Sequence, residues 1–130
     1  MLSKIKLYGT FTYKKKVYNR FPTLNEWINI ERSNKFAAAT IKKVVTNTVR
    51  LQTIGKTKID YPVIFTLYIH STTRHDLDNL GFCTKFIFDG MQKSGMLLND
   101  NQAFVKGYSV YLVKDKEDYV EVLWQKVNED

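Results

Sequence analysis

Residues 61–80, YPVIFTLYIHSTTRHDLDNL, decide the fold expected for this chain. The first ten are rich in β-branched and aromatic residues that alternate along the chain, which predicts a strand with one buried face. That face would carry Val63, Phe65, Leu67 and Ile69. The next residues are polar and lead to Asp76 and Asp78, two carboxylates one residue apart. The segment therefore predicts a buried strand with a functional site at its end.

Helices are predicted on both sides of this strand. Residues 23–26, TLNE, follow Pro22 and form a capping box, so a helix is expected to begin there and to end near residues 33–34. A second helix is expected from about residue 35 to residue 51, with an apolar face made of Ala37, Ile41, Val44, Val45 and Thr48. A third is expected over residues 79–93, because Gly95 follows at a C-cap position.

Further strands are predicted towards both ends of the chain. Residues 2–9 alternate, and residues 10–18 form either a lysine-rich hairpin arm or a mobile loop. Residues 104–114 and 118–126 also alternate and are joined by three charged residues, which predicts that they pair as a hairpin. The order β, αα, β, α, ββ predicts an α+β fold in a single domain, residues 1–130, with a mostly antiparallel mixed sheet and helices packed on one face.

The composition is that of a soluble globular protein. Hydrophobic residues make up 44% of the 130 residues and charged residues 25%. No apolar run approaches the roughly 18 residues that span a bilayer, so no membrane partner is expected. The single cysteine, Cys83, favours a reducing, cytoplasmic setting. Cys83 is interpreted as a small buried hydrophobe, with a nucleophilic role as the alternative.

Positive charge is concentrated in the first half of the chain. The net charge is +7, and residues 1–60 carry 13 Lys or Arg against 3 Asp or Glu, whereas residues 61–130 carry 7 against 10. A basic half beside a carboxylate-bearing half suits a metal nuclease, although a mildly basic balance also occurs without any nucleic-acid partner. The candidate DNA-backbone contacts are Lys14, Lys15, Lys16, Lys42, Lys43 and Arg50. For the cations on the second helix, a solvated helix face is the favoured interpretation and contact with the DNA backbone is the alternative.

Asp76, Asp78 and Asp100 are the candidate metal ligands. Alternate side chains of an extended segment point the same way, so Asp76 and Asp78 are expected to face one cation. Asp100 follows the third helix and is expected to return to the same place if that helix packs antiparallel to the strand. Such hard oxygen ligands favour Mg²⁺, which would polarise a phosphoryl oxygen and lower the pKa of an attacking water. Lys85 would neutralise charge on the phosphate or the leaving group.

The acidic segment is also open to interpretations without a catalytic role. Residues 76–79, DLDN, are typical of a helix N-cap, where Asp and Asn stabilise the positive end of the helix. A calcium loop of the EF-hand kind is excluded, because Leu80 and Ile87 stand where its fifth and twelfth positions need oxygen ligands. The N-cap interpretation therefore remains the alternative to a metal site.

Nearby polar residues are open to more than one role. Asp89 lies four residues after Lys85 and is expected to form a salt bridge with it, with a metal contact as the alternative. His70 and His75 flank the acidic segment, but two histidines without a cysteine partner make a poor zinc site. His75 would instead contact a phosphate or assist proton transfer.

The motifs between residues 74 and 102 resemble those of the RusA-type Holliday-junction resolvases. They are RHDLDNL at residues 74–80, TKFIFDGM at 84–91, SG at 94–95 and ND at 99–100. The likeness extends more loosely over nearly the whole chain, and FPTLNEW at residues 21–27 looks like the shorter phage-borne members of that family.

The resemblance implies a RusA-like fold and a homodimer that nicks two strands of a four-way DNA junction symmetrically, with Mg²⁺ or Mn²⁺. Its metal-binding acids would be Asp76, Asp78 and Asp100, its essential lysine Lys85, and Arg74 a further DNA contact. This chain departs from the pattern in two places. The spacing from the acids to Lys85 is about three residues longer, and Asn99 stands where many members have an aspartate, as a neutral oxygen donor or a turn former.

The sequence thus predicts a magnesium-dependent endodeoxyribonuclease of phage or prophage type, working in the cytoplasm of a bacterium or a phage-infected host. Its task would be the resolution of Holliday junctions in DNA recombination, repair or phage replication. One alternative is a nuclease of the same fold that prefers flaps or forks. Another is a non-catalytic branched-DNA-binding protein in which the acids cap a helix, and a purely structural oligomer ranks third.

Overall fold

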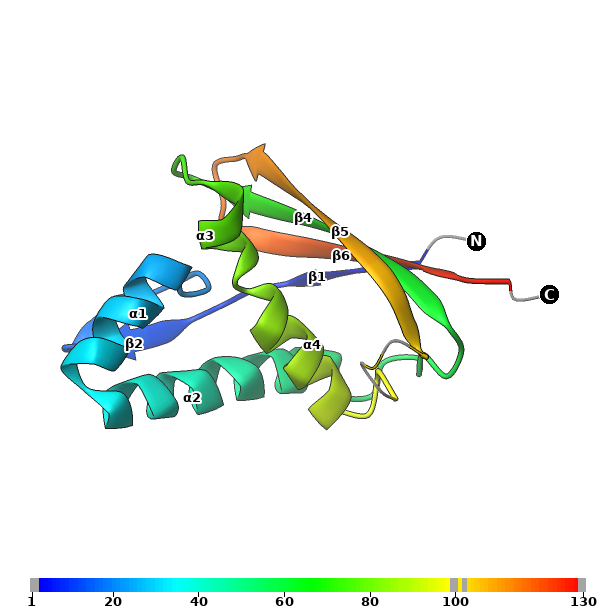
Figure 1. Cartoon of the computed structure of the whole chain (residues 1–130), viewed down its shortest axis with the longest axis horizontal. Helices are drawn as coiled ribbons and strands as arrows, with labels where there is room; N and C mark the ends of the chain where they lie inside the picture. The colour runs from blue at the N-terminus through cyan, green and yellow to red at the C-terminus, as the bar shows by residue number, and fades with distance from the viewer. Residues whose placement is uncertain (1–2, 99–100, 102, 129–130) are drawn as a thin grey trace.

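The computed structural model describes residues 3–98, 101 and 103–128, which form one small α+β domain (Figure 1). The elements are β1 (Ser3–Leu7), β2 (Phe11–Tyr13), β3 (Lys16–Tyr18), α1 (Leu24–Ser33), α2 (Lys35–Thr53), β4 (Val63–Ser71), α3 (Leu77–Gly81), α4 (Thr84–Lys93), β5 (Val105–Lys114) and β6 (Tyr119–Lys126). Among the described residues, no helix has both the length and the apolar character that crossing a bilayer requires.

The main sheet has four strands in the order β1-β6-β4-β5. β6 is antiparallel to both of its neighbours, β1 and β4, and β4 is parallel to β5. The predicted strand is the most buried of the four, since Val63, Phe65 and Leu67 are fully buried on the face that the helices cover. The α+β class and the mostly antiparallel mixed sheet are therefore as predicted.

The predicted hairpin between residues 104–114 and 118–126 is wrong, because β4 lies between β5 and β6. A strand as apolar as β4 gains more from burial between two neighbours than from a place at the edge. The four residues that join β5 to β6 can cross one strand, a distance of about 10 Å. Hydrogen bonds hold this connection against β4: Asp115 N–H donates to Ser71 O at 3.0 Å, and Thr72 N–H donates to Asp118 Oδ1 at 2.9 Å.

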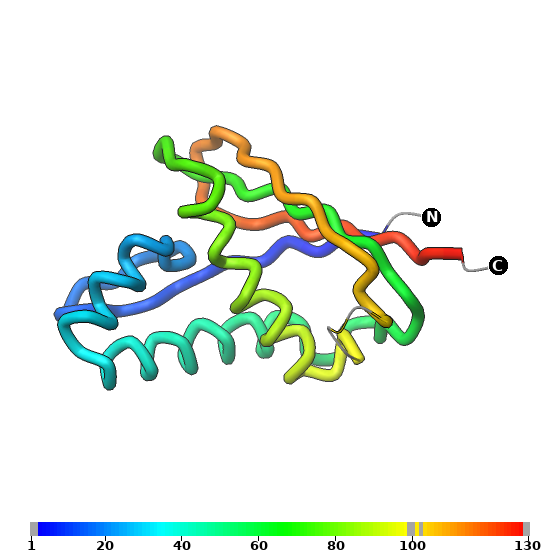
Figure 2. The backbone as a smooth tube through the Cα atoms, in the orientation of Figure 1, coloured from blue at the N-terminus to red at the C-terminus, as the bar shows by residue number. Residues whose placement is uncertain are grey.

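The helices α2 and α4 cross one face of the sheet, as Figures 1 and 2 show. The buried residues of α2 are Ala38, Ile41, Val45, Thr46, Val49 and Thr53. The apolar face predicted for this helix was therefore misplaced by about one residue, and Val44 is 47% exposed. Close packing against α4 explains the shift, because Gly90 lies directly against Val49 and turns that side of α2 inward.

The local predictions for helix ends are confirmed, with one exception. Thr23 caps α1, and its side chain and that of Glu26 form the reciprocal capping box. Gly95 has a φ of +83°, the left-handed conformation that ends α4. The single helix expected over residues 79–93 is instead divided into α3 and α4 at Phe82 and Cys83. Gly81, a poor helix former, immediately precedes this break.

Gly90→Ala should destabilise the protein by about 1–3 kcal/mol, the usual cost of overpacking a core. The added Cβ would lie 2.5 Å from Val49 Cβ and 2.9 Å from Thr46 O, so the two helices would have to separate. Gly81→Ala is the matched control, because nothing lies within 4 Å of its added Cβ. Urea unfolding measures both changes, and equal stability of the two variants would contradict the close contact.

Candidate functional site

The predicted acidic residues lie just beyond the carboxyl end of β4. Asp76 is the N-cap residue of α3 with an extended backbone (φ −72°, ψ 152°), and Asp78 lies in the first turn of that helix. Both side chains are exposed. The prediction that both acids lie on one extended segment is wrong, since helix α3 begins at Leu77 and Asp78 is already helical.

Asp76 occupies the N-cap position of α3, as the alternative interpretation expects, but its side chain does not form the capping hydrogen bond. An N-cap aspartate usually accepts a hydrogen bond from the backbone of the first helical turn. Asp76 forms no such side-chain bond, and among the described residues Asp78 Oδ1 accepts from the N–H of the next residue, Asn79, at 3.0 Å. Most of the hydrogen-bonding capacity of the two carboxylates therefore remains open to a ligand.

Asn79 fixes the acidic segment to the rest of the fold, a role that the sequence did not indicate. Its Oδ1 accepts from Asn25 N–H, in the first turn of α1, at 2.9 Å. Its Nδ2 lies 3.1 Å from His75 Nδ1. These contacts join the start of α3 to the start of α1, which lie close together in Figure 1.

An open groove of about 460 Å³ runs beside Asp76. Its polar lining includes Thr73, Arg74, His75, Asp76 and Lys114. Lys114 Nζ donates to Thr72 O at 2.8 Å, which holds this cation at the groove. The groove thus has one carboxylate and two cationic side chains in its lining, which suits an anionic ligand together with a cation bound at the carboxylate. Lys114 was not among the predicted contacts, because its strand was expected in a distant hairpin.

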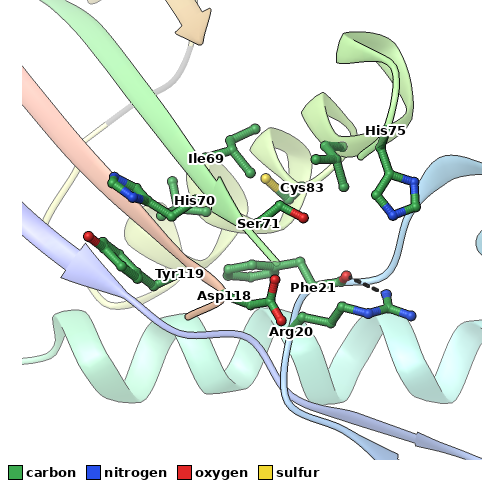
Figure 3. Close-up of a pocket in the computed structure, with 11 residues that line it drawn as sticks. Arg20, Phe21, Ile69, His70, Ser71, His75, Cys83, Asp118 and Tyr119 are labelled. Atoms are coloured by element: carbon green, nitrogen blue, oxygen red, sulfur yellow. Dashed lines mark hydrogen bonds between the residues drawn. The ribbon is translucent and has the colours of Figure 1, made fainter. Parts of the chain in front are cut away.

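A smaller cavity of about 30 Å³ shares His75 with the groove, and Figure 3 shows Arg20, His70 and Asp118 around it. The His70 ring stacks on Tyr119 at 4.1 Å between centroids, and its Nδ1 lies 2.8 Å from Asp115 Oδ2. The hydrogen bond from His70 lowers the pKa of Asp115. His70 is thus engaged in holding the β5–β6 connection.

Cys83 also lines this cavity and is almost completely buried. Burial raises the pKa of the Cys83 thiol to about 12. A thiol that stays protonated is a poor nucleophile. The interpretation of Cys83 as a buried hydrophobe is therefore supported.

Lys85 is exposed in the first turn of α4. Lys85 follows Asp78 by seven residues, but the break at Phe82 and Cys83 puts the two residues on different helices. The expected salt bridge between Lys85 and Asp89 is absent from the ion pairs that the described residues form. Lys85 is therefore available to an anionic ligand.

Asp100, the third predicted metal ligand, and its neighbour Asn99 lie outside the described residues. The described residues on either side, Leu98 and Asn101, lie near the amino end of β4. Leu98 N–H donates to Ile59 O at 3.4 Å, and Asn101 O accepts from Val105 N–H at 2.8 Å. The nine residues of β4 span roughly 26 Å to the end that Asp76 follows. Within the described part of the chain, no group of three or more His, Cys, Asp or Glu side chains is arranged to hold a metal.

The predicted DNA-contacting cations are distributed over two elements. Lys14 and Lys15 form the turn between β2 and β3, and Lys16 begins β3; all three are exposed. On α2, Lys43 is exposed, whereas Lys42 is half-buried. Arg50, also half-buried, donates from Nε to Asn47 Oδ1 at 2.8 Å. The hairpin therefore offers the more accessible charges.

Arg20 was not singled out by the sequence, although it holds the start of α1. Its two terminal nitrogens donate to the Glu26 carboxylate at 2.6 and 2.7 Å. Glu26 also accepts from Thr23 N–H at 2.9 Å. Burial alone would raise the pKa of Glu26, but the hydrogen bonds from Arg20 and Thr23 outweigh it, so the net pKa lies below its usual value of 4.5.

The chain has no match among models of known protein families or among curated protein sequences.

Glu26 should make stability fall in acid. A carboxylate with a lowered folded pKa stabilises the protein above its unfolded pKa, near 4.5, and this contribution is lost as the pH falls through the folded pKa. Glu26→Gln should therefore lower the free energy of unfolding most near neutral pH, and the difference from wild type should shrink below about pH 4.5. Urea unfolding across this range measures it, with Glu31→Gln on the same helix as control. A difference that does not change with pH would contradict the role of this ion pair.

Proposed function

We propose that this protein is a magnesium-dependent endodeoxyribonuclease of the RusA type that resolves four-way DNA junctions by paired nicks. The proposal depends mainly on the carboxylate of Asp76, which stands at a helix N-cap but forms no capping hydrogen bond. Asp78 follows two residues later, and Asp76 lines a groove together with Arg74 and Lys114. The resemblance of residues 74–102 to the resolvase motifs supports the same activity.

The residues around Asp76 suit a hard divalent cation. Asp76 and Asp78 supply carboxylate oxygens, the ligands that Mg²⁺ and Mn²⁺ prefer, and neither side chain forms an ion pair among the described residues. When bound, the cation would polarise the scissile phosphate and activate water. Arg74 and Lys114 would hold the non-bridging oxygens of the phosphate, and Lys85 would stabilise charge on the leaving group.

The position of Asp100 in the sequence leads to a proposal about the homodimer. Asp100 lies outside the described residues, and we propose it as the third metal ligand, supplied either by the same chain or by the second copy of a homodimer. Edge strand β5 offers the means for the second copy to do so, since two copies of β5 paired antiparallel about a two-fold axis bring the start of one strand to the end of the other.

The free edge of β5 is suited to such pairing. β5 has ten residues and carries Tyr108 and Tyr111, which are 53% and 52% exposed. The opposite edge strand, β1, has only five residues, and so short an edge discourages edge-to-edge association, whereas each of the two edge strands exposes two lysines. A two-fold dimer would also match the paired cuts that junction resolution requires.

Asp78→Asn should reduce magnesium-dependent cleavage of a labelled four-way junction by about 100-fold or more, because it removes a ligand charge at the metal. Junction affinity without metal should stay within about threefold of wild type, since backbone contacts dominate binding. Asp60→Asn, an exposed acid elsewhere, is the control. Retained nicking by Asp78→Asn would overturn the assignment. If the wild-type protein cleaved flaps or forks in preference to junctions, the proposed substrate would be wrong, whereas the proposed metal-dependent hydrolysis would stand.

Mixing two inactive variants tests the shared site. Asp76→Asn and Asp100→Asn should each be inactive alone. If each site takes Asp76 from one copy and Asp100 from the other, a mixed dimer contains one intact site, and nicking should return to about a quarter of the wild-type rate after random exchange of subunits. Two inactive variants that stay inactive after verified exchange would show that the acids act within one chain or not at all.

A further inference from the structure

The turn between β2 and β3 has a backbone that lysine does not favour. Tyr13 pairs with Lys16, so Lys14 and Lys15 are the two central residues of the turn. Their φ angles are 50° and 67°. Positive φ at both central positions is typical of hairpin turns made by Asn-Gly, because side chains with a Cβ are strained there. Lysine at both positions therefore points to a role for the charges.

The cations of this hairpin are supported by aromatic rings and not by acids. Lys14 Nζ lies 5.4 Å from the centre of the Tyr13 ring, and Lys16 Nζ lies 4.9 Å from that of Tyr18. None of the ion pairs among the described residues involves Lys14, Lys15 or Lys16. The hairpin thus presents three lysines that contact tyrosine rings or solvent and form none of the ion pairs among the described residues.

A groove of about 550 Å³ lies between the hairpin and the corner between α1 and α2, and its lining combines apolar side chains, among them Ala37 and Ile41, with polar ones. It is lined by Thr12, Tyr13, Lys14, Ser33, Asn34 and Thr40, among others, and contains no acidic residue. Phe36, at the start of α2, is 87% exposed. Hydroxyl and amide groups beside lysines are the side chains that contact a phosphate backbone.

Helix α1 links this groove to the acidic site. Its first turn is bound to Asn79 through Asn25, and its last residue, Ser33, lines the groove. Ten helical residues are about 15 Å long.

We propose that the β2–β3 hairpin binds the phosphate backbone of a duplex arm at the end of α1 opposite to the acidic site. This inference rests on the proposed function and adds the mode of DNA binding. The contact is sequence-independent, because lysines at a ribbon tip bind phosphates and not base edges. An acidic protein segment is the competing ligand, and it is disfavoured because the same chain carries a candidate phosphodiester site one helix length away.

The double substitution Lys14→Asn/Lys15→Gly removes two charges without destabilising the hairpin, because Asn-Gly suits this turn better than Lys-Lys. We expect an equal or higher melting temperature together with weaker binding of a labelled four-way junction. The slope of log affinity against log salt should fall by about two, since each lost phosphate contact removes about 0.9. Binding is measured without metal, so that cleavage does not interfere. Lys16→Gln, outside the turn, should reduce the slope by about one.

Lys56→Asn/Lys58→Asn is the matched control, because it removes two exposed charges outside the hairpin. Equal losses of junction affinity in the two double variants, or an unchanged salt slope in the hairpin variant, would overturn this inference. If the wild-type protein still cleaved the junction, the proposed function would be unaffected by that result. A wild-type protein that neither binds nor cleaves the junction would instead overturn the proposed function itself.

Discussion

The burial of β4 between β6 and β5 is the constraint on which the rest of the structure depends. β4 and β5 are parallel, and parallel neighbours cannot be joined by a tight turn, so the chain between them must return along the sheet. Helices α3 and α4 make most of this return. The return begins at the carboxyl end of β4, where Asp76 and Asp78 lie. The place of the acidic pair is therefore a consequence of the strand order.

Two features of the fold are locally suboptimal and both concern exposed charge. Asp76 occupies a helix-cap position without capping, and Lys14 and Lys15 occupy a turn that favours Asn-Gly. Departures from local preference are expected where function competes with stability. Both departures lie near opposite ends of α1, which joins them as a rigid spacer. The proposed metal site and the proposed DNA contact would therefore stand at a fixed separation.

Sequence patterns predicted what depends on near neighbours. The capping box at Thr23, the alternation of β4 and the stop at Gly95 are local, and all are present. The order of β5 and β6 depends on competition between strands for the centre of the sheet, which no single segment reveals. The bonds of Asn79 and Lys114 at the site depend on residues distant in sequence, and the sequence alone could not identify them.

The burial of Cys83 has a practical consequence. It is the only cysteine in the chain, and its thiol is both shielded and protonated at neutral pH. Maleimide reagents react with exposed thiolates, so the natural protein should remain unlabelled while folded. A single cysteine introduced on the surface would then carry a fluorophore selectively, without removal of the native thiol.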